Sequence, residues 1–483
     1  MRKAGVLLAV SGLPSNHGIG DFGNNAYRFI DDLNKSDFKI WQILPLNPLG
    51  YGNSPYQPYS SKAMDELYIS LDQLKKDGLI KSELKNFNTK SNQVDYEAVR
   101  SFKLSYLEEA FSNFVQGSAY QAFKDEEWVY NFAVFMVLKK KNGNKQWNLW
   151  EKDDINWIVD KKIDLSHYEE EIEFEIFKQF ILLEQWLKLK EYTNNLGIEI
   201  MGDIPFYVGL DSIDVYENRD AFLLDSQYFP TSVAGVPPDY FAEFGQRWGN
   251  PIYNWNYLKE SDYQFWNDRI YYNSKLFDIV RIDHFRAFDT YWKIPATCPT
   301  AVEGSWEKAP GIDFFMQLTN KYPKIELVAE DLGDLSPGVP LLRDKFNFKG
   351  MKIMQFEIDP NEPSEMLSHP QNAICYLGTH DNSPIVGWYN LQSKKTQTYT
   401  DKLLRKPYYD YKPRYLRFLE RALESNADYT IIAMQDLLGQ GEKYRINVPG
   451  TIGYPNWAYK MVDFRKFETD LHIFKRLIKK YGR

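Results

Sequence analysis

Asp278-Ile-Val-Arg-Ile-Asp283-His284-Phe-Arg286 is a short apolar run that ends in charged residues. A near-continuous apolar run of this length is typical of a strand buried on both faces, as in a parallel sheet. Seven further runs have the same form: Gly5–Val10, Phe38–Leu46, Ile198–Val208, Ile325–Glu330, Gly350–Phe356, Ala373–Thr379 and Thr430–Leu437. Helical patterns separate many of them, most clearly at Glu175–Asn195, where Gly197 indicates the helix end. The sequence therefore predicts an α/β fold, a (β/α)8 TIM barrel.

The spacing of the runs predicts insertions after the second and third strands. A minimal barrel uses about 30 residues per strand–helix unit. The gap from Leu46 to Ile198 is about five times longer, and the gap from Val208 to Ile279 also exceeds this length. We expect one barrel over 1–483 with inserted subdomains at approximately 52–172, largely helical, and 209–277, and no C-terminal β-sandwich domain. The charge runs Lys139–Lys145 and Glu169–Glu175 are predicted to be solvated.

Composition excludes several classes of protein. The 483 residues include 58 basic and 66 acidic side chains, a net charge of −8, which argues against nucleic-acid binding. Two cysteines cannot form a disulfide framework and favour a reducing, cytoplasmic compartment. The run Ala4–Val10 fits a buried first strand; a secretory signal is the alternative, but no convincing cleavage site follows. No run approaches the roughly 20 apolar residues of a membrane span.

Three of the predicted strands end in acidic residues. They contribute Asp283, Glu330 and Asp381, and active sites of such barrels lie at the C-terminal ends of the strands. Arg281 lies two residues before Asp283 and therefore on the same strand face, where its charge favours an ionised, nucleophilic carboxylate. The alternative for each acid alone is a cap of the following helix. Three together in one barrel favour an active site.

A set of carboxyl groups suits the cleavage of glycosidic bonds. One carboxylate attacks the anomeric carbon, and a second carboxyl protonates the leaving oxygen and later deprotonates the acceptor. Aromatic side chains, which cover the apolar face of a sugar, cluster in or beside the insertions and include Tyr56, Tyr59, Tyr240, Phe241, Phe244 and Trp248. Ordinary core packing explains such rings equally well. No Walker, CxxC or HExxH pattern is present, and the six histidines are scattered, so no metal site is predicted.

Motifs along essentially the whole chain resemble one family. They are Gly5-Val-Leu-Leu, Ser11-Gly-Leu-Pro-Ser15, Trp41-Gln-Ile-Leu-Pro-Leu46, Gly50-Tyr-Gly-Asn-Ser-Pro-Tyr-Gln57, Gly202-Asp-Ile-Pro-Phe-Tyr-Val208, Val233-Ala-Gly-Val-Pro-Pro-Asp-Tyr-Phe241, Gly245-Gln-Arg-Trp-Gly-Asn-Pro251, Arg281-Ile-Asp-His-Phe-Arg286, Ala329-Glu-Asp-Leu-Gly333, Gly378-Thr-His-Asp-Asn382, Pro449-Gly-Thr and Asn456-Trp457. In order, they resemble the amylomaltases, the 4-α-glucanotransferases of glycoside hydrolase family 77 in the α-amylase clan.

The resemblance implies a role for each matching residue. Asp283 matches the nucleophile, Glu330 the general acid/base, and Asp381 the third carboxylate that stabilises the transition state. The remaining positions match substrate-binding residues: Arg281, His284 and His380 around the donor sugar, Asp203 and Tyr56 on the donor side, and Phe241 and Trp248 in the acceptor-side loop Pro237–Trp248. The family implies no metal and no organic cofactor. Its donors and acceptors are maltose, maltodextrins and α-1,4-glucans.

The chain departs from the family pattern at several positions that the resemblance identifies, among them Ser383-Pro384, which follows Asn382 where other polar residues are usual. Ala9 replaces a usual His, Ala287 replaces a usual Gly, and Ala242 and Phe244 replace the usual Ser and Thr of the acceptor-side loop. None is one of the three carboxylates. Two alternatives to a transferase remain at this stage: a hydrolase that uses water as acceptor, and a glucan-binding protein without turnover.

Overall fold

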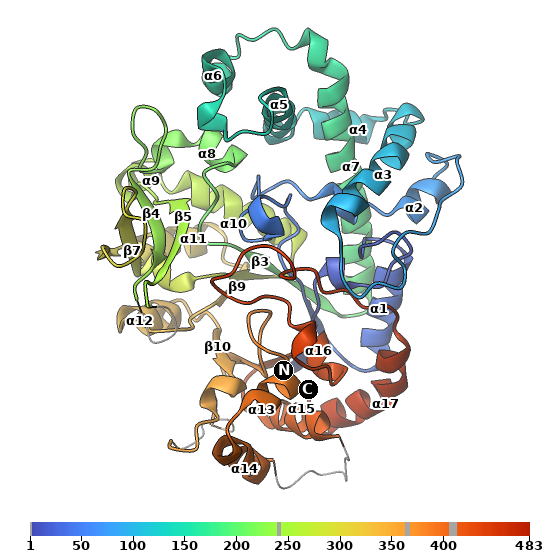
Figure 1. The fold of residues 1–483 in the computed structure, drawn as a ribbon, viewed down its shortest axis with the longest axis vertical. Coiled ribbons are helices and arrows are strands. Elements are labelled where there is room, and N and C mark those ends of the chain that lie inside the picture. The colour runs from blue at the N-terminus through green and yellow to red at the C-terminus, as the bar shows by residue number, and fades with distance from the viewer. Residues whose placement is uncertain (1, 239–242, 363–367, 405–412) are drawn as a thin grey trace.

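The computed structural model describes residues 2–238, 243–362, 368–404 and 413–483. Eight parallel strands form its central sheet (Figure 1). They are β1 (Lys3–Leu7), β2 (Ile40–Gln42), β3 (Glu199–Ile204), β6 (Ile279–Ile282), β9 (Glu326–Ala329), β10 (Gly350–Ile353), β11 (Ala373–Tyr376) and β12 (Tyr429–Ala433). Each strand overlaps one of the eight apolar runs, although β1 and β12 begin one or two residues earlier, which confirms the strand prediction.

The sheet curls into a nearly closed barrel. Its strand order is β10-β11-β12-β1-β2-β3-β6-β9, and every hydrogen-bonded neighbour is parallel. The two end strands also meet, because the Ala329 N–H donates to the Lys349 carbonyl at 2.8 Å beside a parallel bridge between Val328 and Lys349. The predicted TIM barrel is confirmed.

Helices connect most of the barrel strands. Those between or after them are α1 (Asn24–Lys35), α7 (Glu169–Asn195), α10 (Gln264–Leu276), α11 (Gly311–Lys321), α12 (Gly338–Lys345), α13 (Ile385–Leu391), α14 (Lys394–Leu403), α15 (Arg414–Glu424), α16 (Met434–Leu437) and α17 (Arg465–Lys480). Helix α7 ends where the sequence predicts: Gly197 adopts φ +68°, a backbone conformation that terminates helices.

Long segments follow β2 and β3. The first carries α2 (Leu71–Lys76), α3 (Tyr96–Ser112), α4 (Ser118–Lys124), α5 (Glu127–Lys141) and α6 (Lys152–Asp160), which occupy the top and the upper right side of the molecule in Figure 1. The second carries α8 (Ile213–Glu217), β4 (Ser232–Val236), β5 (Gln246–Pro251) and α9 (Trp255–Glu260). The expected insertions after the second and third barrel strands are therefore present.

A second sheet was not foreseen from the sequence. Its order is β5-β4-β7-β8, all antiparallel, and it adds β7 (Thr290–Pro295) and β8 (Ser305–Lys308) to the two strands of the second insertion. Strands β4 and β5 precede the fourth barrel strand, β6, whereas β7 and β8 follow it. The second sheet is therefore built from two separate parts of the chain.

The chain ends lie side by side in Figure 1. Arg2 donates to the Ser425 carbonyl at 2.9 Å and also bonds the Tyr481 carbonyl, which joins the first strand to the last helix region. Strand β1 is buried between β12 and β2, so the run Ala4–Val10 begins with a barrel strand. Among the described residues, no helix is both long and apolar enough to cross a membrane.

Candidate active site

The three predicted carboxyl residues all follow barrel strands at their C-terminal ends. Asp283 follows β6, Glu330 follows β9, and Asp381 lies in the loop after β11. Backbone hydrogen bonds between the strands continue as far as Asp283 and Glu330. The Asp283 N–H donates to the Ile204 carbonyl at 3.0 Å, and the Glu330 N–H donates to the Ile282 carbonyl at 3.0 Å. Neighbouring strands therefore place Asp283 and Glu330 side by side at the barrel rim.

A cleft of about 690 Å³ opens over these strand ends. The predicted residues Asp283, Asp381, His380, Tyr56 and Trp248 line it. Its other lining residues are Gly52, Ser54, Gln57, Gly245, Gln246, Arg247, Asn447, Pro449, Gly450, Thr451, Ile452, Gly453 and Trp457. Segments from the two insertions and from the loop after β12 thus meet around the predicted carboxylates.

Arg281 lies between Asp203 and Asp283 and contacts both carboxylates. Its Nη1 lies 2.6 Å from both carboxylate oxygens of Asp203 and 3.1 Å from Asp283 Oδ1. The Tyr56 hydroxyl donates to Asp203 Oδ2 at 2.8 Å. Arg281 and Asp203 are buried, whereas 28% of the Asp283 side chain is exposed. The guanidinium therefore fixes the orientation of Asp283 and leaves its other oxygen free of that contact.

Glu330 is held by backbone donors. Its Oε2 accepts from the His284 N–H at 2.6 Å and its Oε1 from the Leu332 N–H at 3.2 Å. Burial raises the pKa of Glu330, and Arg281 opposes that shift. Burial also raises the pKa of Asp283 well above its usual value, again against Arg281 and with a further upward contribution from the charge of Glu330. Burial, not Arg281, is thus the largest influence on both groups.

The two carboxyl groups titrate together because the charge on one disfavours charge on the other. Such a pair retains one proton over a range of pH. The contact between Arg281 and Asp283 at 3.1 Å favours the charge on Asp283, whereas burial and the charges of Asp203 and Glu330 oppose it. Glycosidic cleavage requires an ionised nucleophile and a protonated acid.

Asp381 is positioned by residues from the loop after β12. Asn447 Nδ2 donates to Asp381 Oδ1 at 2.6 Å, and Arg445 Nη2 donates to the Asp381 carbonyl at 2.6 Å. His380 Nε2 lies 3.4 Å from Asp381 Oδ2. The Asp381 side chain is 43% exposed, so its carboxylate remains accessible from the cleft.

Aromatic side chains flank the acids on two sides. Tyr56 stacks on His380 with ring centroids 5.2 Å apart. On the other side, the rings of Trp248 and His284 meet edge to face with their centroids 4.9 Å apart. The centroid of the Tyr207 ring lies 6.1 Å from that of the same imidazole. Burial lowers the pKa of His284 to about 3, so this imidazole is neutral near pH 7. The cleft therefore offers ring faces and neutral hydrogen-bonding groups beside the carboxylates.

Five further positions named from the sequence are not among the described residues that line the cleft. Phe241 and Ala242 lie outside the described residues, so their predicted places in the acceptor-side loop stay predictions. Phe244 is described and is 59% exposed. Ala287 is fully buried, and Ala9 lines a small cavity behind the site.

Sequence reasoning assigned no role to Asn447, Trp457 or Tyr207, although the first two line the cleft. One signal was available for Asn447. It follows the last barrel strand, and the loops after barrel strands build the active-site face.

The chain is similar in sequence and in fold to known proteins. The model of the glycoside hydrolase 77 family, described as 4-alpha-glucanotransferase, matches residues 8–465. A 4-alpha-glucanotransferase of Aquifex aeolicus is 38% identical over 504 residues, covering 100% of both chains, and one of Thermus thermophilus is 37% identical over 480 residues, covering 95% of both. The amylomaltase of Streptococcus agalactiae, solved in complex with acarbose, superposes with a TM-score of 0.93 at 35% identity over 100% of both chains. The chain therefore belongs to the 4-alpha-glucanotransferase family, glycoside hydrolase family 77.

Proposed function

We propose that Asp283, Glu330 and Asp381 carry out the 4-alpha-glucanotransferase reaction of the family to which this chain belongs. The observation that carries the proposal is the contact of Arg281 with Asp283 at 3.1 Å, at a strand end that adjoins Glu330 on the next strand. A carboxylate in contact with a fixed cation serves as the nucleophile, and the neighbouring carboxyl on the adjacent strand serves as the acid. Asp381 supplies the third carboxylate from across the cleft.

The reaction proceeds in two displacements. Asp283 attacks the anomeric carbon of a donor α-1,4-glucan while Glu330 donates its proton to the leaving oxygen, which releases the reducing-end portion. Glu330, now ionised, removes the proton from the 4-hydroxyl of an acceptor sugar, and that oxygen displaces Asp283 from the glucosyl group. Asp381 binds hydroxyls of the distorted donor sugar. Two inversions retain the α configuration.

The substrate-binding roles follow the same geometry. Tyr56, Asp203, Arg281, His284 and His380 surround the donor sugar, with the stacked rings of Tyr56 and His380 as one wall. Trp248 lines the cleft on the side of β5 and serves the acceptor, together with Phe241. Maltose, maltodextrins and longer α-1,4-glucans are the proposed donors and acceptors. The amylomaltase of Streptococcus agalactiae, which was solved with acarbose, supports a glucan-like occupant for this cleft.

We further propose how the chain is organised around this reaction. One catalytic barrel spans 1–483, and approximately 52–172 and 209–277 form inserted subdomains, the second on the acceptor side. The proposed compartment is the cytoplasm, which fits two cysteines that do not pair. Nucleic acid and membrane are not proposed partners, in keeping with the net charge of −8.

Incubation with maltotriose alone, followed by chromatography of the products, tests the function. Transfer between two maltotriose molecules yields glucose together with a ladder of longer maltodextrins, and the number of reducing ends stays constant. Exclusively shorter products with rising reducing ends would identify a hydrolase. No turnover by the folded wild type would leave a glucan-binding protein. The Asp283→Asn variant is the control, because it removes the covalent step and keeps the size of the side chain.

A further inference from the structure

Trp457 forms part of the wall of the catalytic cleft. Its indole lies 5.5 Å from the Tyr56 ring and 5.8 Å from the His380 ring, centroid to centroid, behind the stacked pair of these two rings. Tyr56 in turn donates to Asp203, which holds Arg281. A displacement of the indole would therefore alter the wall on the donor side of the cleft.

The backbone at Trp457 has a conformation that needs support. Its φ is +65°, in the left-handed region that bulky L residues rarely adopt. Two hydrogen bonds hold its peptide groups: the Trp457 N–H donates to the Ile446 carbonyl at 2.7 Å, and the Trp457 carbonyl accepts from the Tyr96 hydroxyl at 2.8 Å. The next residue after Ile446 is Asn447, which binds Asp381. The same turn thus supports both the ring wall and the third carboxylate.

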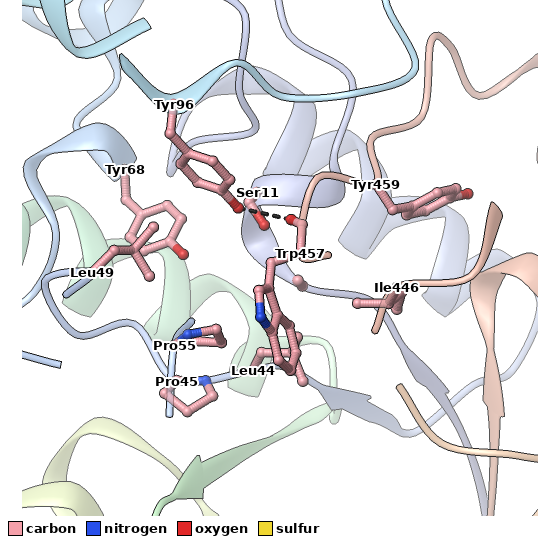
Figure 2. Close-up of a pocket in the computed structure, with 11 residues that line it drawn as sticks. Ser11, Leu44, Pro45, Leu49, Pro55, Tyr68, Tyr96, Ile446, Trp457 and Tyr459 are labelled. Atoms are coloured by element: carbon pink, nitrogen blue, oxygen red, sulfur yellow. Dashed lines mark hydrogen bonds between the residues drawn. The ribbon is translucent and has the colours of Figure 1, made fainter. Parts of the chain in front are cut away.

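Packing behind the indole is incomplete. Figure 2 shows Trp457 and Tyr96 on the wall of a small cavity, with the Tyr96 hydroxyl directed at the Trp457 carbonyl beside Ser11. The cavity has a volume of about 20 Å³, room for about one water molecule. Ala9 lines it, and a larger residue there would fill the space. Because a cavity remains beside the indole, the two backbone hydrogen bonds add to its packing against the core in fixing its place.

Tyr96 comes from a distant part of the chain. It is the first residue of α3, in the first insertion, and it is 7% exposed. The segment before it pairs with the segment after Trp457, since the Val94 N–H donates to the Ala458 carbonyl at 2.7 Å and the Lys460 N–H to the Asn92 carbonyl at 2.9 Å. The insertion is therefore joined to the cleft wall at the point where the Tyr96 hydroxyl reaches Trp457.

We propose that Tyr96 is a positioning residue of the transferase site, which acts by holding the Trp457 carbonyl and so fixing the indole behind Tyr56 and His380. This inference rests on the proposed function for the identity of the donor. It makes the first insertion part of the donor site without any contact of its own with the sugar. Loss of the hydroxyl releases the indole and weakens donor binding and cleavage, while the acceptor side is unaffected.

The test is Tyr96→Phe, which removes the hydroxyl and keeps the ring. One hydrogen bond of this kind corresponds to a loss of roughly 2- to 10-fold in kcat/KM for maltotriose. The apparent KM for glucose as acceptor should not change. Tyr106→Phe is the matched control, because Tyr106 lies on the same helix and its hydroxyl donates to the Glu83 carbonyl at 3.2 Å, away from Trp457. The control should lower the melting temperature comparably without a change in kcat/KM per folded molecule.

A double-mutant cycle with Trp457→Phe separates positioning from general stability. If Tyr96 acts through Trp457, the double variant loses no more kcat/KM than Trp457→Phe alone. Additive losses, or an unchanged kcat/KM in Tyr96→Phe, would overturn the inference. Calorimetric binding of maltotriose in the Asp283→Asn background gives a second measurement, in which Tyr96→Phe should weaken binding. A wild type that fails to form longer maltodextrins, with this binding effect intact, would refute the proposed function and leave the inference standing.

Discussion

Phe244 should control the balance between transfer and hydrolysis. It lies directly before Gly245 to Trp248, which line the cleft, and its carbonyl accepts from the Ala301 N–H at 3.1 Å. Its ring is 59% exposed, so its packing against the protein is limited. The resemblance to the family identified a small hydroxyl residue as usual at this position. We expect the ring to form part of the platform for the acceptor sugar.

The size of the effect follows from the exposed ring. A phenylalanine side chain buries about 200 Å² when covered completely, so 59% exposure leaves about 120 Å² open. A sugar covers one face, about half of this area, which corresponds to about 1.5 kcal/mol at about 25 cal/mol per Å². Phe244→Ser should then raise the apparent KM of the acceptor by about tenfold. Stability should change by less than about 0.5 kcal/mol, because the ring is exposed.

The assay measures two products in the same reaction. Maltotriose is incubated with increasing glucose, and transfer products and net reducing ends are quantified in parallel. Phe244→Ser should shift products towards hydrolysis, because water reaches the glucosyl enzyme when the acceptor is held less well. Phe229→Ser removes another exposed ring of the second insertion and is the control. An unchanged ratio of transfer to hydrolysis, with a lower melting temperature, would refute the reasoning and make Phe244 a packing residue.

Three further predictions address individual side chains. Glu330→Gln should cleave α-glucosyl fluoride far better than maltotriose, because fluoride needs no proton to leave, and equal losses in the rates on both donors would contradict its role as acid. Asn447→Ala removes the 2.6 Å bond to Asp381 and should lower kcat/KM roughly 10- to 100-fold with little change in melting temperature. Burial raises the pKa of Asp436 from 3.8 to about 7. The folded protein therefore binds this proton more tightly than the unfolded chain does. As the pH rises from about 4 to about 7, the free energy of unfolding falls by up to about 4 kcal/mol. Asp436→Asn keeps the acceptor for the Ile385 N–H and removes the buried charge. It should therefore stabilise the protein by about 1–3 kcal/mol at about pH 8 and not at about pH 4, as measured by urea titration. Equal effects at both pH values would contradict the raised pKa of Asp436.

The barrel could be predicted because its strands are buried on both faces. This burial gives continuous apolar runs, and all eight strands were recognisable from them. The second sheet could not be predicted in the same way. Its strands β7 and β8 are partly exposed, and β7 pairs with β4, which lies more than fifty residues earlier in the chain. Such pairing depends on the folded barrel and leaves little pattern in the local sequence.

The part of the candidate site that lies directly at the strand ends could be predicted from the sequence. The C-terminal ends of parallel strands converge, so Asp283 and Glu330 had to be neighbours once the barrel was recognised. The bond between Asn447 and Asp381 joins residues 66 apart and depends on the path of an irregular loop.

Lys139 shows how a local charge pattern can mislead. Its basic run was predicted to be solvated, but the side chain is buried, pairs with Asp211 and lies 4.8 Å from the centre of the Tyr59 ring. The prediction was wrong for this residue because its partners come from distant segments.

Trapping of the covalent intermediate tests the central claim most directly. Glu330→Gln is incubated with α-glucosyl fluoride, digested with a protease and analysed by mass spectrometry. The first displacement needs no proton from residue 330, whereas the second is slowed because its base is absent. The account predicts one added glucosyl group on the peptide that contains Asp283, and only a slow loss of this group when maltose is supplied as acceptor, because residue 330 no longer provides the base. A label on Asp381 or Asp203, or fluoride release without any labelled peptide, would contradict the assignment of Asp283 as nucleophile.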